Sequence, residues 1–191
     1  GIFYSEYNSV RCAVDLLECQ PSAGIGANHE WSVVVGGQSS NPSVEMTSYK
    51  SPEIYEMPDY QWPFINTAGG SAITIFGDQF GPVQLSPYYE AINAHYGSER
   101  QWDLGLPWSV QSKSCQVVVA HVSIVCIVGE GTGHNHSWEV TVGGQYSNRF
   151  AAGSSYSAPM LAAFEVGEAS VPEVLDIQSF ATRGGQFVEL Q

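Results

Sequence analysis

The chain has 191 residues, enough for one or two small domains, and 43% of them are hydrophobic, so a buried core can form. Its 6 basic and 19 acidic residues give a net charge of −13, which repels phosphate backbones and anionic membranes and so excludes nucleic-acid binding. The most apolar stretch, 117–128, is shorter than the ~20 residues of a membrane-spanning helix, so no membrane insertion is expected. Because the chain begins with Gly1 and shows no signal peptide, we expect a processed product or part of a longer protein.

The first predicted element is a half-buried strand over residues 29–35. Side chains there alternate with the period of two that is typical of a strand, and the Gly36-Gly37 pair predicts a turn at its end. The inward face is expected to carry His29, Trp31, Val33 and Val35. Residues 42–56, which follow, have the composition of a linker with apolar anchors.

The middle of the chain predicts two further strands. Ile73 and Ile75 alternate after a Gly-Gly turn. Ser86 and Pro87 are typical of a helix start, whereas the alternation of 92–96 is typical of a strand. Both interpretations are open for this stretch, and we favour a short turn followed by a strand.

Two more strands are predicted over 116–126 and 136–142. The second repeats the first element, with His136, Trp138, Val140 and Val142 inward and Ser137, Glu139 and Thr141 outward. Pro and Gly recur throughout and no long segment has a helical period. The sequence therefore predicts an all-β fold of short strands, a sandwich.

The chain also repeats itself. The residues around Cys19 return 107 residues later, around Cys126, without a gap. The shared residues are Cys19, Asn28-His29, Trp31, Gly36-Gly37-Gln38, Ser40-Asn41, Tyr49 and Pro52, matched by Cys126, Asn135-His136, Trp138, Gly143-Gly144-Gln145, Ser147-Asn148, Tyr156 and Pro159. A second pair matches Gly69-Gly70, Ile73 and Ile75 with Gly184-Gly185, Val188 and Leu190. Such repetition predicts an array of modules, which typically builds surfaces, spacers or fibres.

The repeat predicts three parts. Residues 1–54 are expected to be the rear part of one module, 55–165 a complete module with an aromatic-rich insertion at 82–114, and 166–191 the leading strands of another.

The pattern resembles the IPT/TIG family of immunoglobulin-like modules found in cell-surface receptors and large extracellular proteins. The residues that carry the resemblance are Gly69-Gly70, Gly77-Asp78-Gln79-Phe80-Gly81, Cys115, Cys126, Gly131-Thr132-Gly133, Gly143-Gly144-Gln145-Tyr146-Ser147, Tyr156 and Pro159. Departures are the long stretch between Gly81 and Cys115, and Ile127-Val128 where the family favours Pro. The resemblance implies tandem immunoglobulin-like β-sandwiches and an extracellular or cell-surface location.

The same resemblance implies two disulfides, Cys12–Cys19 and Cys115–Cys126. Each would close a short loop within one module and stabilise it by roughly 2–3 kcal/mol. Disulfides form in oxidising compartments, in agreement with the implied location.

Other candidate sites are weak. Asn135 begins an Asn-x-Ser glycosylation sequon. His134 and His136 alone are too few ligands for zinc. Two acidic clusters, Glu53, Glu56 and Asp59, and Glu165, Glu168, Glu173 and Asp176, could hold structural calcium, although we favour a solvated acidic face. We therefore expect no cofactor and, in the absence of any catalytic motif, no enzyme.

Two interpretations of function are open. We favour a structural or adhesive rod or filament in which residues 172–191 of one copy complete the sandwich begun by residues 1–50 of the next. The assembly strands would be Gly184, Gly185, Val188 and Leu190 on one side and Gly1, Ile2 and Phe3 on the other. The alternative is a carbohydrate- or receptor-type binding module with an aromatic patch of Trp102, Trp108, Tyr88 and Tyr89, or an accessory domain of a secreted enzyme.

Overall fold

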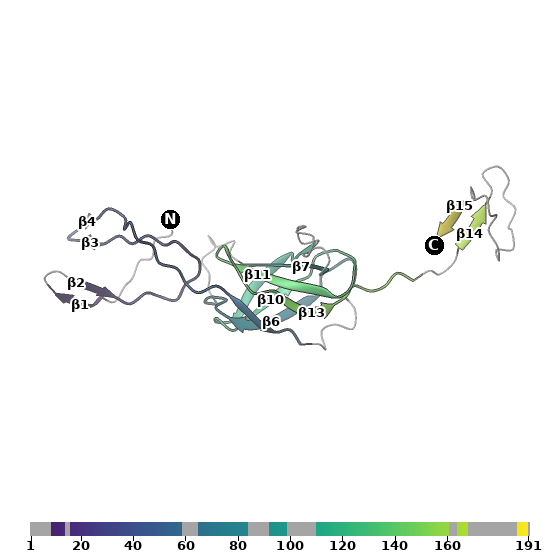
Figure 1. Ribbon diagram of the computed structural model, residues 1–191, viewed down its shortest axis with the longest axis horizontal. Helices are drawn as coiled ribbons and strands as arrows, with labels where there is room; N and C mark the ends of the chain where they lie inside the picture. Colours follow the sequence, from purple (N-terminus) through teal and green to yellow (C-terminus); the bar gives the residue numbers. More distant parts are fainter. Residues whose placement is uncertain are drawn as a thin grey trace. The chain divides into compact units, whose positions relative to one another are not determined.

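The computed structural model describes residues 9–13, 16–58, 65–83, 92–98, 110–160, 164–167 and 187–190. The chain divides into two compact units, Gly1–Ser157 and Ala158–Gln191 (Figure 1). Within the described ranges every sheet is antiparallel and there is no helix, which confirms the all-β prediction. Two of the strands cross the predicted part boundaries, because the boundary after 54 falls inside β5 (Glu53–Glu56) and that after 165 inside β14 (Phe164–Gly167).

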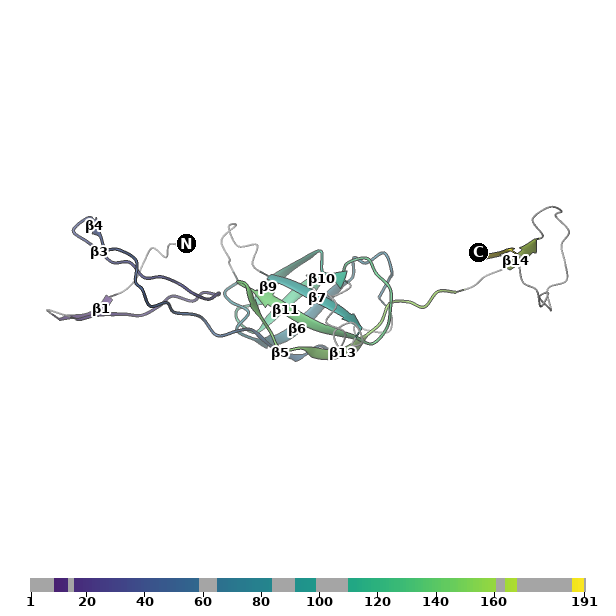
Figure 2. The same cartoon turned by 45° about the horizontal axis from the view of Figure 1, so that its top comes forward.

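The centre of the first unit is formed by two sheets that face each other, here called the two-sheet body (Figure 2). One sheet has the strand order β5-β6-β10-β9, with β6 at Ala72–Asp78, β9 at Ser114–Val119 and β10 at Ser123–Ile127. The other has the order β12-β11-β7-β8, with β7 at Ile92–Ser98, β8 at Val110–Gln111, β11 at His136–Val142 and β12 at Gln145–Tyr146. Strand β13 (Phe150–Ser154) also pairs with β11, and Ile65 forms a parallel bridge with Tyr156.

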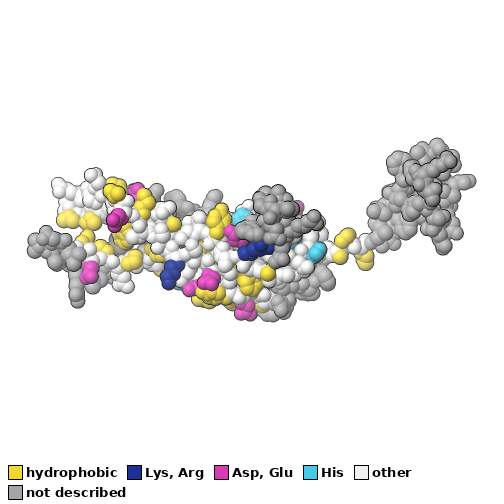
Figure 3. Space-filling model, viewed as in Figure 1, with side chains coloured by type: hydrophobic (Ala, Val, Ile, Leu, Met, Phe, Trp, Pro, Cys, Tyr) yellow, Lys and Arg dark blue, Asp and Glu magenta, His cyan; other side chains and the backbone are white. Residues whose placement is uncertain are grey.

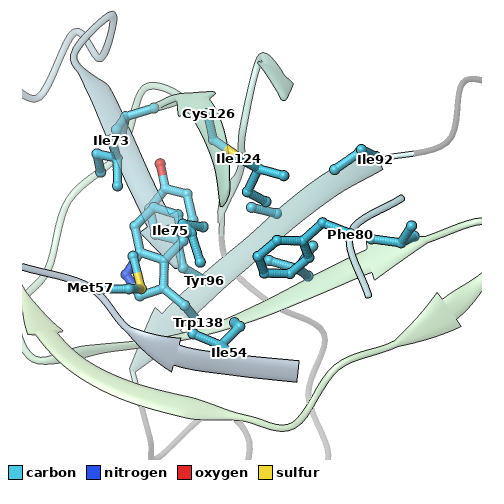
Figure 4. Close-up of a cluster of buried hydrophobic side chains, with 14 of the residues drawn as sticks. Ile54, Met57, Ile73, Ile75, Phe80, Ile92, Tyr96, Ile124, Cys126 and Trp138 are labelled. Atoms are coloured by element: carbon cyan, nitrogen blue, oxygen red, sulfur yellow. The ribbon is translucent and has the colours of Figure 1, made fainter. Parts of the chain in front are cut away.

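A single hydrophobic core fills the space between these sheets (Figure 4). Ile73 and Ile75 of β6 are 1% and 0% exposed, as the alternation of that strand predicts. Across from them the rings of Tyr96 and Trp138 stack with centroids 4.0 Å apart. The predicted strands at 73–75, 92–96 and 136–142 are thereby confirmed, whereas residues 84–91, where the helix start was considered, lie outside the described residues.

Two details of the predicted strands are wrong. Residues 116–126 form a hairpin, β9 and β10, with a turn in which His121 adopts a φ of 65°. No Gly, Pro or Asn marks that turn, so the sequence carried no signal for it. Ser137 and Glu139 of β11 were expected to face outward, yet both are buried, because burial depends on what covers a sheet face and not only on residue type.

The remaining strands form three short hairpin-like pairs. In the first unit β1 (Ser9–Ala13) pairs with β2 (Leu16–Cys19), and β3 (Val34–Val35) pairs with β4 (Gln38–Ser39). In the second unit β14 pairs with β15 (Phe187–Leu190).

Candidate interaction surface

Two segments of the first unit, 107 residues apart, share several hydrogen bonds; we call residues 19–49 the first repeat and 126–156 the second repeat. The indole nitrogen Nε1 of Trp31 donates to Thr47 Oγ1 at 2.8 Å, and that of Trp138 donates to Ser154 Oγ at 2.8 Å. The position of each donor and each acceptor shifts by the same 107 residues. The likeness in sequence is therefore a likeness in local structure.

Backbone and ring contacts extend this equivalence. The Val33 amide donates to Ser40 Oγ at 3.0 Å, and the equivalent Val140 amide donates to Ser147 Oγ at 2.9 Å. The rings of His29 and Tyr49 lie edge to face at 5.5 Å, and their counterparts in the second repeat, His136 and Tyr156, do so at 5.4 Å.

The turns of the two repeats also agree. Gly36 and Gly37 have φ values of 59° and 82°, and Gly143 and Gly144 have 56° and 79°. Two successive positive φ values belong to the tight hairpin turn that matches strand twist, and glycine adopts them without steric cost.

What differs between the repeats is burial. Val140 and Val142 are 0% and 1% exposed in the core of the two-sheet body, whereas their counterparts Val33 and Val35 are 38% and 71% exposed. Trp138 is completely buried, and Trp31 is only partly so. Figure 3 shows hydrophobic side chains around the β3–β4 end of the unit. We call the side chains of Trp31, Val33 and Val35 the open face.

The open face differs from the second repeat in the described strands that cover it. In the body, β6 and β7 supply Ile73, Ile75 and Tyr96 to the core beneath β11. Among the described residues no strand stands in that relation to the first repeat. The predicted half-buried strand at 29–35 is accordingly reduced to β3 and one bridge between His29 and Thr47.

An asparagine that clamps an edge strand in the second repeat has an exposed counterpart in the first repeat. The Asn148 carboxamide accepts a hydrogen bond from the Ile54 amide at 2.7 Å and donates to the Ile54 carbonyl at 3.0 Å, so it holds β5 in place. Its counterpart Asn41 is exposed. The asparagine of the first repeat is therefore exposed, as the valines of the open face are.

The first repeat packs end-on against the two-sheet body. Ile25 is 3% exposed and belongs to the core cluster, and Gly143 lies against Gly26 so closely that a Cβ on Gly143 would be 2.7 Å from the Gly26 nitrogen. Gln145 Nε2 donates to the Tyr49 carbonyl at 3.0 Å. The first repeat thus contacts the glycine turn of the second repeat.

The cysteines fall into two cases. Cys115 and Cys126 are opposite each other in β9 and β10, with Cα atoms 4.1 Å apart, and form the predicted disulfide. The predicted Cys12–Cys19 bond is not formed, because the β1–β2 register places Ser9 opposite Cys19 and Leu17 opposite Cys12. Cys19 is a free, exposed cysteine.

Two buried tyrosines of the body and the Gly129 backbone form a closed triangle of hydrogen bonds. Tyr96 OH lies 2.8 Å from Tyr156 OH, Tyr156 OH donates to the Gly129 carbonyl at 2.8 Å, and the Gly129 amide donates to Tyr96 OH at 3.0 Å. Burial raises the pKa of both tyrosines and lowers the pKa of His136, whose ring lies beside them. These shifts disfavour the charged forms, as expected of a structural network.

The structure places the remaining predicted residues as follows. Asn135 is exposed at a turn with a φ of 51°. His134 is exposed whereas His136 is buried, so the two do not share a surface. Glu53 and Glu56 are exposed on β5, Glu165 is opposite Glu189 in β14–β15, and within the described ranges no group of three metal-capable side chains exists.

The predicted assembly and patch residues lie only partly within the described residues. Val188 and Leu190 belong to β15, opposite Val166 and Phe164. Those outside the described residues are the other assembly positions Gly1, Ile2, Phe3, Gly184 and Gly185, the aromatic patch of Tyr88, Tyr89, Trp102 and Trp108, and the acidic residues Asp59, Glu168, Glu173 and Asp176.

Comparisons with known proteins found no match, so a function is proposed from the geometry of the two repeats. No family model, no curated protein and no solved structure matches the chain. No helix among the residues that the structure describes is long and apolar enough to cross a membrane.

Proposed function

We propose that this chain is a noncatalytic structural protein, built from immunoglobulin-like modules of the IPT/TIG type, that joins head to tail with other copies in an extracellular filament. The observation that carries the proposal is the open face: the first repeat has the local structure of a module, but its core valines are exposed. Exposed apolar surface costs roughly 25 cal/mol per Å² relative to burial, so covering this face would drive association.

The strand order of the two-sheet body supports an immunoglobulin-like module. If the strands from β5 to β11 are lettered in sequence as A, B, C, C′, D, E and F, and β13 as G, one sheet is A-B-E-D and the other contains C′-C-F-G. This is the arrangement of seven- to nine-stranded immunoglobulin-like sandwiches. Ile65, which lies between β5 and β6, forms a parallel bridge with Tyr156, which follows β13. The chain that links strands A and B therefore also contacts the chain that follows strand G.

In this proposal the second unit supplies the front strands that complete the first repeat of the next copy. The pair β14–β15 is antiparallel, like β5–β6 at the front of the body, and Val188 and Leu190 of β15 align in sequence with the core residues Ile73 and Ile75. Strand addition to an incomplete sheet uses backbone hydrogen bonds for affinity and alternate side chains for specificity. A contact between two different surfaces of identical copies does not close on itself, so it produces a fibre.

The extracellular part of the proposal has separate support. The Cys115–Cys126 disulfide is the kind of bond that persists in oxidising compartments. Asn135 is exposed, so a glycan attached to its sequon would extend into solvent.

The test is assembly of the purified protein, followed by light scattering coupled to size exclusion and by negative-stain electron microscopy. Because each copy carries −13 charges, the buffer should contain about 0.15 M salt, where the Debye length is about 8 Å. We expect filaments for the wild type and monomers for Val33→Ser/Val35→Ser. The control is Val44→Ser, which is 95% exposed and aligns with the exposed Ala151 rather than with a core residue.

Two results would contradict the proposal. One is a wild type that stays monomeric at every concentration tested. The other is a Val33→Ser/Val35→Ser variant that assembles as readily as the wild type, since the open face would then play no part.

A further inference from the structure

The end-on contact within the chain has a knob and a socket. The knob is the Gly143-Gly144-Gln145 turn, and the socket is formed by Ile25, Gly26 and the Tyr49 carbonyl. A Cβ on Gly143 would lie 2.7 Å from the Gly26 nitrogen, 2.8 Å from its Cα and 3.2 Å from Ile25 Cγ1. Only glycine fits there, and the Gln145 amide secures the turn through its 3.0 Å hydrogen bond to Tyr49 O.

The same turn occurs once more, in the first repeat, where no described residue lies against its glycines. The turn Gly36-Gly37-Gln38 has the same pair of positive φ values as Gly143 and Gly144. No described atom lies within 4 Å of where a Cβ on Gly36 or Gly37 would stand, and Gln38 is exposed. The Gly36-Gly37-Gln38 turn therefore has the same backbone conformation and is exposed to solvent.

The socket also occurs once more, with two exposed residues and with Tyr156, which is 4% exposed. Thr132 and Gly133 align with Ile25 and Gly26, but they are exposed where the first pair is buried. The backbone has the same shape, because the Tyr156 amide donates to the Gly133 carbonyl at 2.9 Å, as the Tyr49 amide does to Gly26. The φ values of Gly26 and Gly133 are also close, 96° and 109°.

We propose that the Gly36-Gly37-Gln38 turn of one copy docks into the Thr132, Gly133 and Tyr156 socket of a second copy, and so repeats between copies the contact observed within the chain. The inference rests on the proposed function, because it names the partner of the filament end as a second copy. Gly36 lies against Gly133, and Gln38 donates to the Tyr156 carbonyl.

The chemistry of the two surfaces fits this partner. Neither the turn nor the socket carries a charged residue, so copies with a charge of −13 meet here without a like-charge pair. The contact joins two different surfaces, so it propagates along one direction. Thr132 replaces Ile25, and Ala158 replaces Ser51, whose hydroxyl lies 3.5 Å from Gln145 Nε2, so the contact between copies is weaker than the one within the chain.

The test compares two substitutions in the same turn. Asn tolerates positive φ better than other side chains, and an Asn-Gly turn is favoured in hairpins, so Gly36→Asn preserves the turn. By its equivalence to Gly143, a side chain at Gly36 collides with the socket of the second copy. Gly37→Asn is the matched control, since a Cβ at the equivalent Gly144 meets no described atom within 4 Å.

We expect Gly36→Asn to raise the concentration needed for filament growth by at least about tenfold, and Gly37→Asn to leave it near the wild-type value. Thr132→Arg changes an exposed side chain on the socket and is expected to have the same effect as Gly36→Asn. If Gly36→Asn fails to fold by circular dichroism, Thr132→Arg decides the question alone.

A mixing experiment tests the direction of the contact. Gly36→Asn keeps an intact socket and Thr132→Arg keeps an intact turn, so an equimolar mixture contains one functional pairing and should yield dimers but no filaments. Filaments of Gly36→Asn or Thr132→Arg at the wild-type concentration would overturn the inference while leaving the proposed function intact. A wild type that never assembles would overturn both.

Discussion

Trp31 and Trp138 make the same indole hydrogen bond, each at 2.8 Å to a hydroxyl sixteen residues further on, but only Trp138 is buried. Trp138 stacks on Tyr96 of a neighbouring strand, whereas Trp31 remains partly exposed. The indole hydrogen bond of Trp31 therefore forms even though Trp31 is not buried in a core as Trp138 is. This pairing of equivalent residues in different environments supplies matched controls for mutational tests.

The first prediction concerns the tyrosine network. Tyr156→Phe removes the donor to the Gly129 carbonyl and a partner of Tyr96, all buried, so we expect a loss of about 1–3 kcal/mol in the free energy of unfolding of the body. The control is Tyr49→Phe, which removes the equivalent 2.7 Å bond to the Ser22 carbonyl at an exposed position where water can replace it. Urea denaturation measures both, and equal effects would contradict the prediction.

The second prediction concerns the asparagine clamp. Asn148→Ala leaves the Ile54 amide and carbonyl of β5 without their partners, so unfolding should become easier by about 1–3 kcal/mol. Asn41→Ala, at the exposed equivalent position, should change the stability of the isolated chain by less than about 0.5 kcal/mol. Chemical denaturation of both variants under monomeric conditions is the measurement. A loss in Asn41→Ala as large as that in Asn148→Ala would show that the first repeat already holds a strand there.

The third prediction concerns the cysteines. Cys115→Ala/Cys126→Ala opens a crosslink with a sequence separation of 11 and should lower stability by about 2–3 kcal/mol, whereas Cys19→Ser at an exposed free thiol should be neutral. Nonreducing peptide mapping should find Cys115 joined to Cys126, and Cys19 should be alkylated without denaturant. Recovery of Cys19 in an intramolecular bridge would refute the β1–β2 register.

The fourth prediction concerns pH. Burial lowers the pKa of His136 below its ordinary value of 6.5, so the unfolded chain takes up a proton at a higher pH than the folded chain does. This contribution to stability is complete above about pH 6.5 and is lost as the pH falls, by at most about 1.4 kcal/mol per pH unit. Denaturation curves between pH 7.5 and 5.5 should show the slope in the wild type and a flatter one in His136→Gln. An NMR titration that places the His136 pKa above 6.5 would reverse the sign and disprove the prediction.

Much of the body could be predicted because its strands are marked locally. Ile73 and Ile75 alternate after a glycine turn, and residues 136–142 repeat an earlier pattern. The turn at His121 was missed because no turn-forming residue type marks it, and the burial of Ser137 and Glu139 was missed because polar residue types alone predict an outward face. The contact between the Gly143 turn and Gly26 was also missed, although the alignment of Gly36 with Gly143 could have indicated that this turn recurs.

The sequence by itself determined what depends on neighbours along the chain. The alternation of residues 136–142 and the Gly36-Gly37 and Gly143-Gly144 turns depend on adjacent residues, so the sequence predicted them. Tertiary structure decided which faces are buried and which cysteines meet. Val140 is 0% exposed whereas the equivalent Val33 is 38% exposed, and strand register places Cys115, but not Cys12, opposite its expected partner. The physical reason is that burial and register arise from pairing between strands, which no single strand's pattern encodes.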